Sequence, residues 1–126
     1  MAFTVTALDH IVLNVSDVAA TRAFYERVLG MESREERPGK WSLHFGENKI
    51  SLQDEQSLPA IAARTLPGTG NFCVISDTDL GEWRAHLERE GVEIVASGKR
   101  EGATGLIDSL YFTDPDGNLV EVSNRL

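Results

Sequence analysis

The stretch LDHIVLNVSD, residues 8–17, begins the first regular element of the chain, and its pattern returns in NFCVISD, residues 71–77. Each stretch is a short apolar run that ends in Ser-Asp, and the first of these pairs, Ser16-Asp17, can cap a following helix. Alternation along a strand places Ile11 and Leu13 on one face and His10 on the other. The recurrence predicts that the chain contains two copies of one structural unit.

The segments after these two stretches also repeat. A helix is expected through about residue 29 and again after Asp79, and Gly30 and Gly91 follow these helices as stop signals. Three strands are expected after each helix, near residues 31–37, 40–46 and 49–53 and near residues 92–97, 107–113 and 118–124. A short helical turn is expected at residues 58–64.

The two halves align at several positions. We align His44 with Tyr111 on the third strands, and Ile50 with Val120 on the last strands. The second half then needs extra loop residues, for which 98–105 and the turn DPDGN at 114–118 are the natural places.

These elements predict an α+β fold built from two βαβββ modules. Each module would place one helix on one face of a curved four-stranded sheet, and the two remaining faces would form a half-barrel cup. We expect a single domain over residues 1–126, with module one at about 4–56, a linker at about 57–69 and module two at about 70–126.

Composition narrows the class of protein. The 126 residues carry a formal net charge of -8 and are 41% hydrophobic, which is typical of a globular chain and argues against binding to nucleic acid or to anionic membranes. No signal peptide or membrane-spanning run is visible, so we expect a cytoplasmic protein. The single cysteine, Cys73, lies in an apolar run and is expected to be buried.

The order βαβββ-βαβββ, the motif LDHI at residues 8–11 and the motif DPDGNLVE at 114–121 resemble the vicinal oxygen chelate superfamily. That group includes glyoxalase I, fosfomycin-resistance thiol transferases, methylmalonyl-CoA epimerase, extradiol dioxygenases and bleomycin-resistance binding proteins. The resemblance covers nearly the whole chain, which looks most like the small glyoxalase-domain proteins.

The resemblance implies a divalent metal site with one ligand from the first strand and one from the last strand of each module. These positions map to His10 and Glu121, whose nitrogen and oxygen donors suit Zn, Ni, Mn or Fe. The other two positions depart from the pattern, because they carry Asn71 and Ser51. Gln53, which lies on the same face as Ser51, is the substitute ligand that we expect.

The same positions supply candidates for catalysis. Glu121 would hold the ion and shuttle a proton in a glyoxalase-type reaction. His44 is a candidate acid–base group or alternative ligand, and Tyr111 could orient a substrate oxygen. Pocket lining without chemistry is the competing interpretation for His44 and Tyr111.

The resemblance therefore predicts a metal-dependent enzyme acting on a small oxygen-bearing substrate, as a glyoxalase-like lyase or isomerase or as a dioxygenase. The alternative is a metal-free protein of the bleomycin-resistance type that sequesters a small molecule. A third possibility is a decayed site on a protein with an interaction role. A homodimer is expected from the resemblance.

Overall fold

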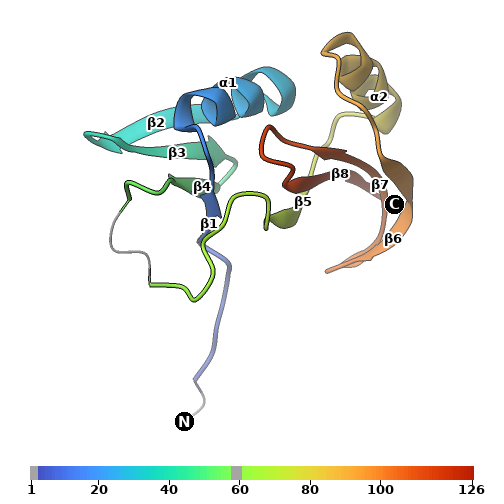
Figure 1. The fold of residues 1–126 in the computed structure, drawn as a ribbon. Coiled ribbons are helices and arrows are strands. Elements are labelled where there is room, and N and C mark those ends of the chain that lie inside the picture. Colours follow the sequence, from blue (N-terminus) through green and yellow to red (C-terminus); the bar gives the residue numbers. More distant parts are fainter. Residues whose placement is uncertain (1–2, 58–60) are drawn as a thin grey trace. The chain divides into compact units, whose positions relative to one another are not determined.

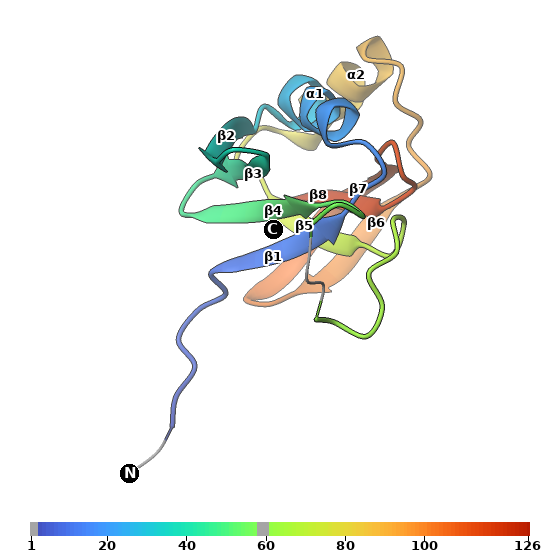
Figure 2. The ribbon, with the colours of Figure 1, turned by 60° about the vertical axis from the view of Figure 1, so that its left-hand side comes forward.

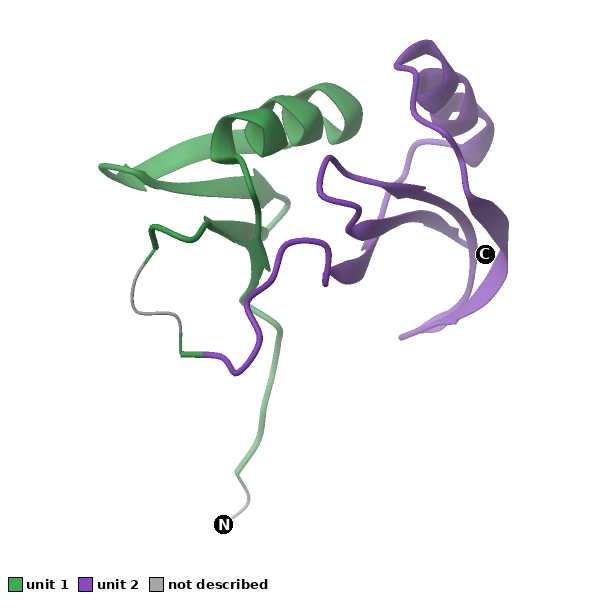
Figure 3. Ribbon diagram, in the orientation of Figure 1, with its two compact units in different colours: residues 1–61 green, residues 62–126 purple. Residues whose placement is uncertain are grey.

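The computed structural model of the protein describes residues 3–57 and 61–126. Contacts within the chain divide it into two compact units, residues 1–61 (unit 1) and residues 62–126 (unit 2), as Figure 3 shows. This boundary falls inside the expected linker at 57–69. The helical turn expected at 58–64 begins on residues 58–60, which lie outside the described residues, and residues 61–64 form no helix.

Unit 1 has the predicted order of one strand, one helix and three strands. These are β1 (His10–Asn14), α1 (Val18–Leu29), β2 (Glu32–Arg37), β3 (Lys40–Phe45) and β4 (Asn48–Gln53). The sheet order is β1-β4-β3-β2, with β1 parallel to β4 and the other neighbours antiparallel. Helix α1 covers one face of this sheet (Figure 1), and Figure 2 shows β1 running beside β4.

Unit 2 repeats this order and topology. Its elements are β5 (Asn71–Ile75), α2 (Leu80–Arg89), β6 (Ala96–Gly102), β7 (Gly105–Thr113) and β8 (Leu119–Arg125). The sheet order is β5-β8-β7-β6, again with one parallel pair, β5 and β8. The expected α+β fold of two βαβββ modules is therefore confirmed.

Both helices begin and end as the sequence predicts. Asp17 caps α1 by accepting a hydrogen bond from the backbone N–H of Ala20, and Asp79 accepts one from Gly81 at the start of α2. Gly30 and Gly91 both have positive φ angles, 67° and 71°, and this left-handed backbone ends each helix.

The alternation of side chains gives each sheet a helix-facing surface and an open face. In unit 1, Leu13, Leu43 and Ile50 are buried together with Tyr25 and Val28 of α1. In unit 2 the corresponding buried residues are Leu110, Phe112, Val120 and Val122, together with Leu87 of α2. Burial of these apolar side chains supplies the main stabilisation of each unit, and the open faces carry the polar residues.

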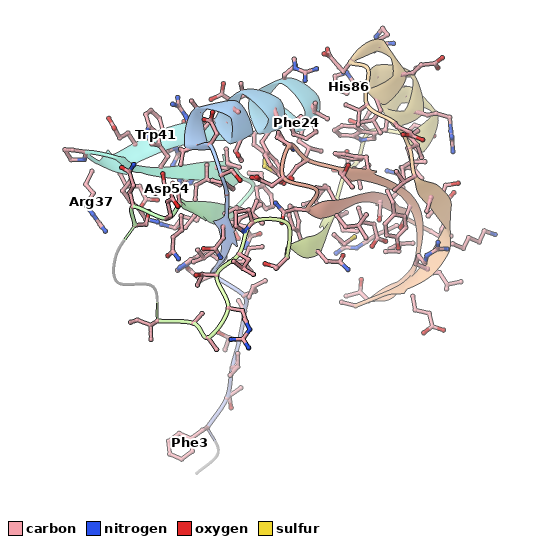
Figure 4. The ribbon with its side chains drawn as sticks, in the orientation of Figure 1. Phe3, Phe24, Arg37, Trp41, Asp54 and His86 are labelled. Carbon is pink, nitrogen blue, oxygen red and sulfur yellow. The ribbon has the colours of Figure 1, made fainter. Side chains whose placement is uncertain are left out.

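Two residues outside the cores are visible in Figure 4. Phe3, in the segment that precedes β1, is fully exposed. Trp41, on β3, lies under the guanidinium of Arg22, which is 3.3 Å from the centroid of its ring.

No helix of the described residues is long and apolar enough to span a membrane.

The sixth strand lies further along the chain than predicted. We expected it near residues 92–97 with loop at 98–105, but β6 runs from Ala96 to Gly102 and pairs with β7 up to Gly102 opposite Gly105. Residues 96–102 do not alternate between apolar and polar side chains. This strand is therefore fixed by its pairing with β7. The turn at 114–118 does supply extra loop residues, as predicted.

The alignments expected for the third and the last strands differ by two residues from the pairing of these strands and do not both hold. Ser51 pairs with Ser42, and Glu121 pairs with Tyr111. If Ser51 and Glu121 are equivalent, the counterpart of Tyr111 is therefore Ser42 and not His44. The turn between β3 and β4 is shorter than the one between β7 and β8, and this difference shifts the register.

Candidate functional site

Glu121 lies at the centre of the open face of unit 2. It sits on β8 between Cys73 on β5 and Tyr111 on β7 in the sheet register. Its Oε2 accepts hydrogen bonds from the hydroxyls of Ser109, at 2.6 Å, and Ser123, at 3.4 Å. These serines occupy the next row of the same face, so the strand register itself assembles the cluster.

Tyr111 completes this cluster. The pKa of its phenol is raised, first because the group is desolvated and then because it hydrogen-bonds Glu121, while a hydrogen bond with Arg100 acts in the opposite direction. The Nε of Arg100 donates to the phenol oxygen at 3.1 Å. Tyr111 therefore stays protonated at neutral pH and donates its hydrogen bond to the Glu121 carboxylate.

Cys73 is exposed on this face, and the prediction that it is buried was wrong. The odd positions of β5 point to the open face, and Cys73 is one of them. Its Sγ lies 3.2 Å from the hydroxyl oxygen of Ser123. The pKa of the thiol is raised, chiefly by desolvation, so a thiolate is disfavoured at neutral pH.

The open face of unit 2 is hollowed. The hollow has a volume of about 470 Å³, within the range of small-molecule sites. Glu121 and Tyr111 lie in it together with Arg100 and Arg125, and its other lining residues are Cys73, Ile75, Glu101, Gly102, Ala103, Thr104 and Ile107. The hollow is therefore lined by two carboxylates, a phenol and two guanidinium groups.

The open face of unit 1 carries His10 and Gln53, but the structure does not bring them together. His10 pairs with Lys49 and Gln53 pairs with Asn14, which puts His10 and Gln53 about 13 Å apart along the parallel strands. The Nε2 of Gln53 donates to Asn14 Oδ1 at 3.0 Å. Asp9 lies 2.7 Å from Nδ1 of His10.

His44 belongs to a different cluster on this face. Its Nε2 lies 2.9 Å from the hydroxyl of Ser42, which donates to Glu36 Oε1 at 2.5 Å. Lys49 Nζ also donates to Glu36, at 2.7 Å. The Lys49 and Ser42 hydrogen bonds lower the pKa of Glu36 to about 2. The cluster ties His44 to buried Ser42 and to Glu36.

A sequence profile of the Glyoxalase/Bleomycin resistance protein/Dioxygenase superfamily matches residues 7–122. This span covers most of both units. The chain belongs to this superfamily. The vicinal oxygen chelate resemblance seen in the two end motifs is thereby confirmed.

Individual members of the superfamily are similar over most of their length. Virulence protein STM3117 of Salmonella typhimurium (strain LT2) is 41% identical over 118 residues, which are 92% of this chain and 82% of that protein. The solved structure of the V. cholerae integron cassette protein VCH_CASS1 matches with a TM-score of 0.95 at 41% identity, covering 100% of both chains. Metallothiol transferase FosB of Staphylococcus epidermidis is 27% identical over 94% of this chain and 83% of its own.

The superfamily includes metalloenzymes such as FosB, so the donor set of this chain needs a chemical test. Within the described residues there is no group of three or more His, Cys, Asp or Glu side chains that could hold a metal ion. In unit 2, the strand neighbours of Glu121 are a protonated thiol and a phenol. In unit 1, His10 lies beside Lys49, a cation. Among the described residues, neither unit by itself groups three or more of the His, Cys and carboxylate ligands that a Zn or Ni site requires.

Of the residues that line the hollow, the sequence analysis named Glu121 and Tyr111 as candidates but did not name the polar residues that surround them. Ser109 and Ser123 are two positions from Tyr111 and Glu121 on the same strands, so the period of two could have identified both. Arg100 was missed because its strand was expected to be a loop.

Proposed function

We propose that this member of the superfamily is an enzyme that acts on a small oxygen-bearing substrate in the unit 2 hollow. Glu121 would take a proton from the substrate and return it. The single observation that supports this role is the setting of the carboxylate. It faces a hollow of substrate size, and its partners among the described residues are hydroxyl and thiol groups.

The residues next to Glu121 would have two roles, to orient its carboxylate and to stabilise charge on the substrate. Ser109 and Ser123 donate to Oε2 and hold the carboxylate in one orientation. Tyr111 donates its hydrogen bond to Glu121 in the free protein, and on substrate binding it would donate instead to a substrate oxygen on which negative charge develops. A positioned carboxylate of this kind typically accelerates proton transfer by roughly 10² to 10⁴.

Replacing Glu121 tests this role. Glu121→Gln keeps the size and the acceptor oxygen but removes the base, so we expect turnover to fall by roughly 10² or more. Glu88→Gln, an exposed carboxylate on α2, is the matched control and should leave turnover unchanged. The substrates to screen are α-ketoaldehydes with glutathione, and catechols. Equal turnover by Glu121→Gln and wild type on every active substrate would refute the proposal.

The divalent ion is a separate prediction. His10 fits the part of a ligand, because Asp9 at Nδ1 orients the ring and leaves Nε2 for another partner. The full set of His10, Gln53 and Glu121 does not fit a single metal site. Gln53 is hydrogen-bonded to Asn14 and lies far from His10 along the sheet. No step of the proposed reaction is therefore routed through a metal.

Metal analysis of protein purified without an affinity tag tests this set. About one divalent ion per chain, lost in Glu121→Ala, would support the metal-dependent enzyme. Protein without metal that also fails to bind Zn, Ni, Mn or Fe in calorimetry would contradict the metal prediction and leave the role of Glu121 intact.

The second candidate function is metal-free sequestration of a small molecule. The incomplete donor set favours it. Tight binding of a ligand in excess chelator, without turnover and with no effect of Glu121→Gln on any reaction, would establish it in place of the enzyme.

We also propose that the protein forms a homodimer, as the superfamily resemblance implies. Light scattering coupled to gel filtration measures the mass directly. A mass near 13.8 kDa, that of one chain, would contradict this proposal.

A further inference from the structure

The segment that precedes β1, residues 3–9, is called the arm here, and it runs away from the sheet of unit 1 (Figure 1 and Figure 2). Pairing of β1 with β4 starts at His10 opposite Lys49. Strand β4 begins one residue earlier, at Asn48, and the turn at 46–47 joins it to β3. Because β1 is also an edge strand, the arm has no strand of its own unit on either side.

The arm exposes both its apolar side chains and its backbone. Phe3, Val5 and Leu8 are 100%, 93% and 70% exposed. The carbonyl of Leu8 accepts a hydrogen bond from Nδ2 of Asn48 at 3.0 Å. In the part of the chain that the structure describes, the backbone groups of residues 3–7 have no hydrogen-bond partner. Unpaired extended backbone of this kind is a template for pairing with another strand.

The sequence of the arm has the pattern of a strand. Phe3, Val5 and Ala7 alternate with two threonines, so a paired arm would have an apolar face and a polar face. Phe, Val and Thr also favour strands. No residue before the aspartate that ends the arm is charged, although 25% of the chain is charged and its net charge is -8. The arm is therefore a neutral contact surface on a chain whose copies otherwise repel each other.

We propose that two copies of the chain associate through their arms, which pair as antiparallel strands about a twofold axis at Val5. The symmetry of such a pair places one residue opposite its own copy at the axis. With Val5 opposite Val5, Phe3 stands opposite Ala7 and Thr4 opposite Thr6. A large apolar side chain then faces a small one, and two threonines form a favourable cross-strand pair.

The side chains specify this register against its neighbours. A slip of one residue would place Val5 opposite a threonine and mix the two faces. A slip of two residues toward the sheet would place Phe3 opposite Asp9. The inference rests on the proposed homodimer, because it names a surface that joins the two copies.

Disulfide trapping in the full chain tests the position of the axis. Cys73 is exposed, so the background variant is Cys73→Ser. Val5→Cys then places the two new thiols opposite each other, with Cα atoms about 4.5 to 5.5 Å apart, within the reach of a disulfide. Two copies of Phe3→Cys would lie roughly 13 Å apart along the strands. Under oxidised glutathione we expect Val5→Cys to give a cross-linked dimer on a non-reducing gel and Phe3→Cys to remain uncross-linked.

Charged variants at the axis give the second measurement. A two-stranded ribbon alone is marginally stable in water, so the quantity to measure is dimer affinity, by analytical ultracentrifugation over a dilution series. Val5→Asp and Val5→Lys each place like charges opposite each other and should weaken the dimer roughly tenfold or more. An equimolar mixture of the two variants should restore it, because opposite charges then face each other. Ile61→Asp, at an apolar residue that is 91% exposed, is the matched control and should leave the affinity unchanged.

Failure of the inference can be told apart from failure of the proposed homodimer. A wild-type dimer whose affinity is unchanged by Val5→Asp, or equal cross-linking of Val5→Cys and Phe3→Cys, would retain the homodimer and reject pairing of the arms. A wild-type protein that stays monomeric would reject both. If Val5→Asp lowers the stability of the chain to urea without changing dimer affinity, the arm packs against its own chain and the inference is overturned.

Discussion

Replacing Asn118 by alanine should destabilise unit 2 strongly. Asn118 ends the turn that leads into β8, and its side chain is fully buried. Its Nδ2 donates to both carboxylate oxygens of Asp114, at 3.1 and 2.9 Å, and its Oδ1 accepts from the backbone N–H of Gly70 at 2.7 Å. The side chain thus joins the start of β5 to the turn before β8, the two strands that carry Cys73 and Glu121.

The magnitude follows from these three hydrogen bonds. Each contributes about 1 kcal/mol, and those to the Asp114 carboxylate contribute somewhat more. The alanine variant also leaves the Gly70 N–H without its partner in a partly buried position. We therefore expect Asn118→Ala to lower the free energy of unfolding by about 3 to 4 kcal/mol, which corresponds to a fall in Tm of roughly 10 °C or more for a chain of this size.

Urea unfolding followed by circular dichroism measures this loss. Asn48→Ala is the matched control, because the exposed Asn48 makes one hydrogen bond, from Nδ2 to the carbonyl of Leu8 at 3.0 Å, and its loss should cost less than about 1 kcal/mol. If Asn118→Ala unfolds within 1 kcal/mol of the wild type, or no earlier than Asn48→Ala, the turn is not held as the structure shows and this reasoning is wrong.

Three further predictions concern single residues. Hydrogen bonds from Lys49 and Ser42 lower the pKa of Glu36 from 4.5 to about 2. The stabilisation by the ionised carboxylate is therefore complete above pH 4.5 and is lost as the pH falls toward 2. Glu36→Gln should flatten this part of the acid unfolding curve, and an unchanged curve would contradict the ion pair. Desolvation by neighbouring side chains raises the pKa of the exposed Cys73 thiol, so alkylation by iodoacetamide should be slower than that of glutathione at pH 7 and should accelerate above pH 9. Rapid reaction at pH 7 would contradict this. Gly30 has a φ of 67° with open space around its Cα, so Gly30→Ala should cost about 1 kcal/mol in urea unfolding through backbone strain alone, and a neutral effect would show that the helix ends differently.

The fold was largely predictable because the repeated elements carry local signals. Asp17 and Gly30 mark the ends of α1, and the alternation around Ile11 and Leu13 marks β1, all within a few residues. The bounds of β6 were predicted wrongly because this strand carries no local signal. Residues 98–102 have neither the alternation nor the β-branched composition of a strand, and they become one only through pairing with β7.

The candidate site was predictable only in part. Glu121 could be assigned to an open face from the valines on either side of it, and Tyr111 from the alternation of its own strand. The separation of His10 from Gln53 could not be predicted, because it depends on which residues of β1 and β4 stand opposite one another. The two-residue shift between His44 and Ser42 arises in the same way, from the length of a turn.

The sequence by itself determined the two βαβββ units, their helix ends and the faces on which the polar side chains lie, because these depend on spacing and on local backbone preference. Only the tertiary structure decided which polar residues meet. The register of β8 between β5 and β7 places Glu121 beside Cys73 and Tyr111, and the pairing of β6 with β7 brings Arg100 into the same hollow as Arg125. Register is set by long-range hydrogen bonding and core packing, and a shift of one residue would turn each of these side chains to the other face.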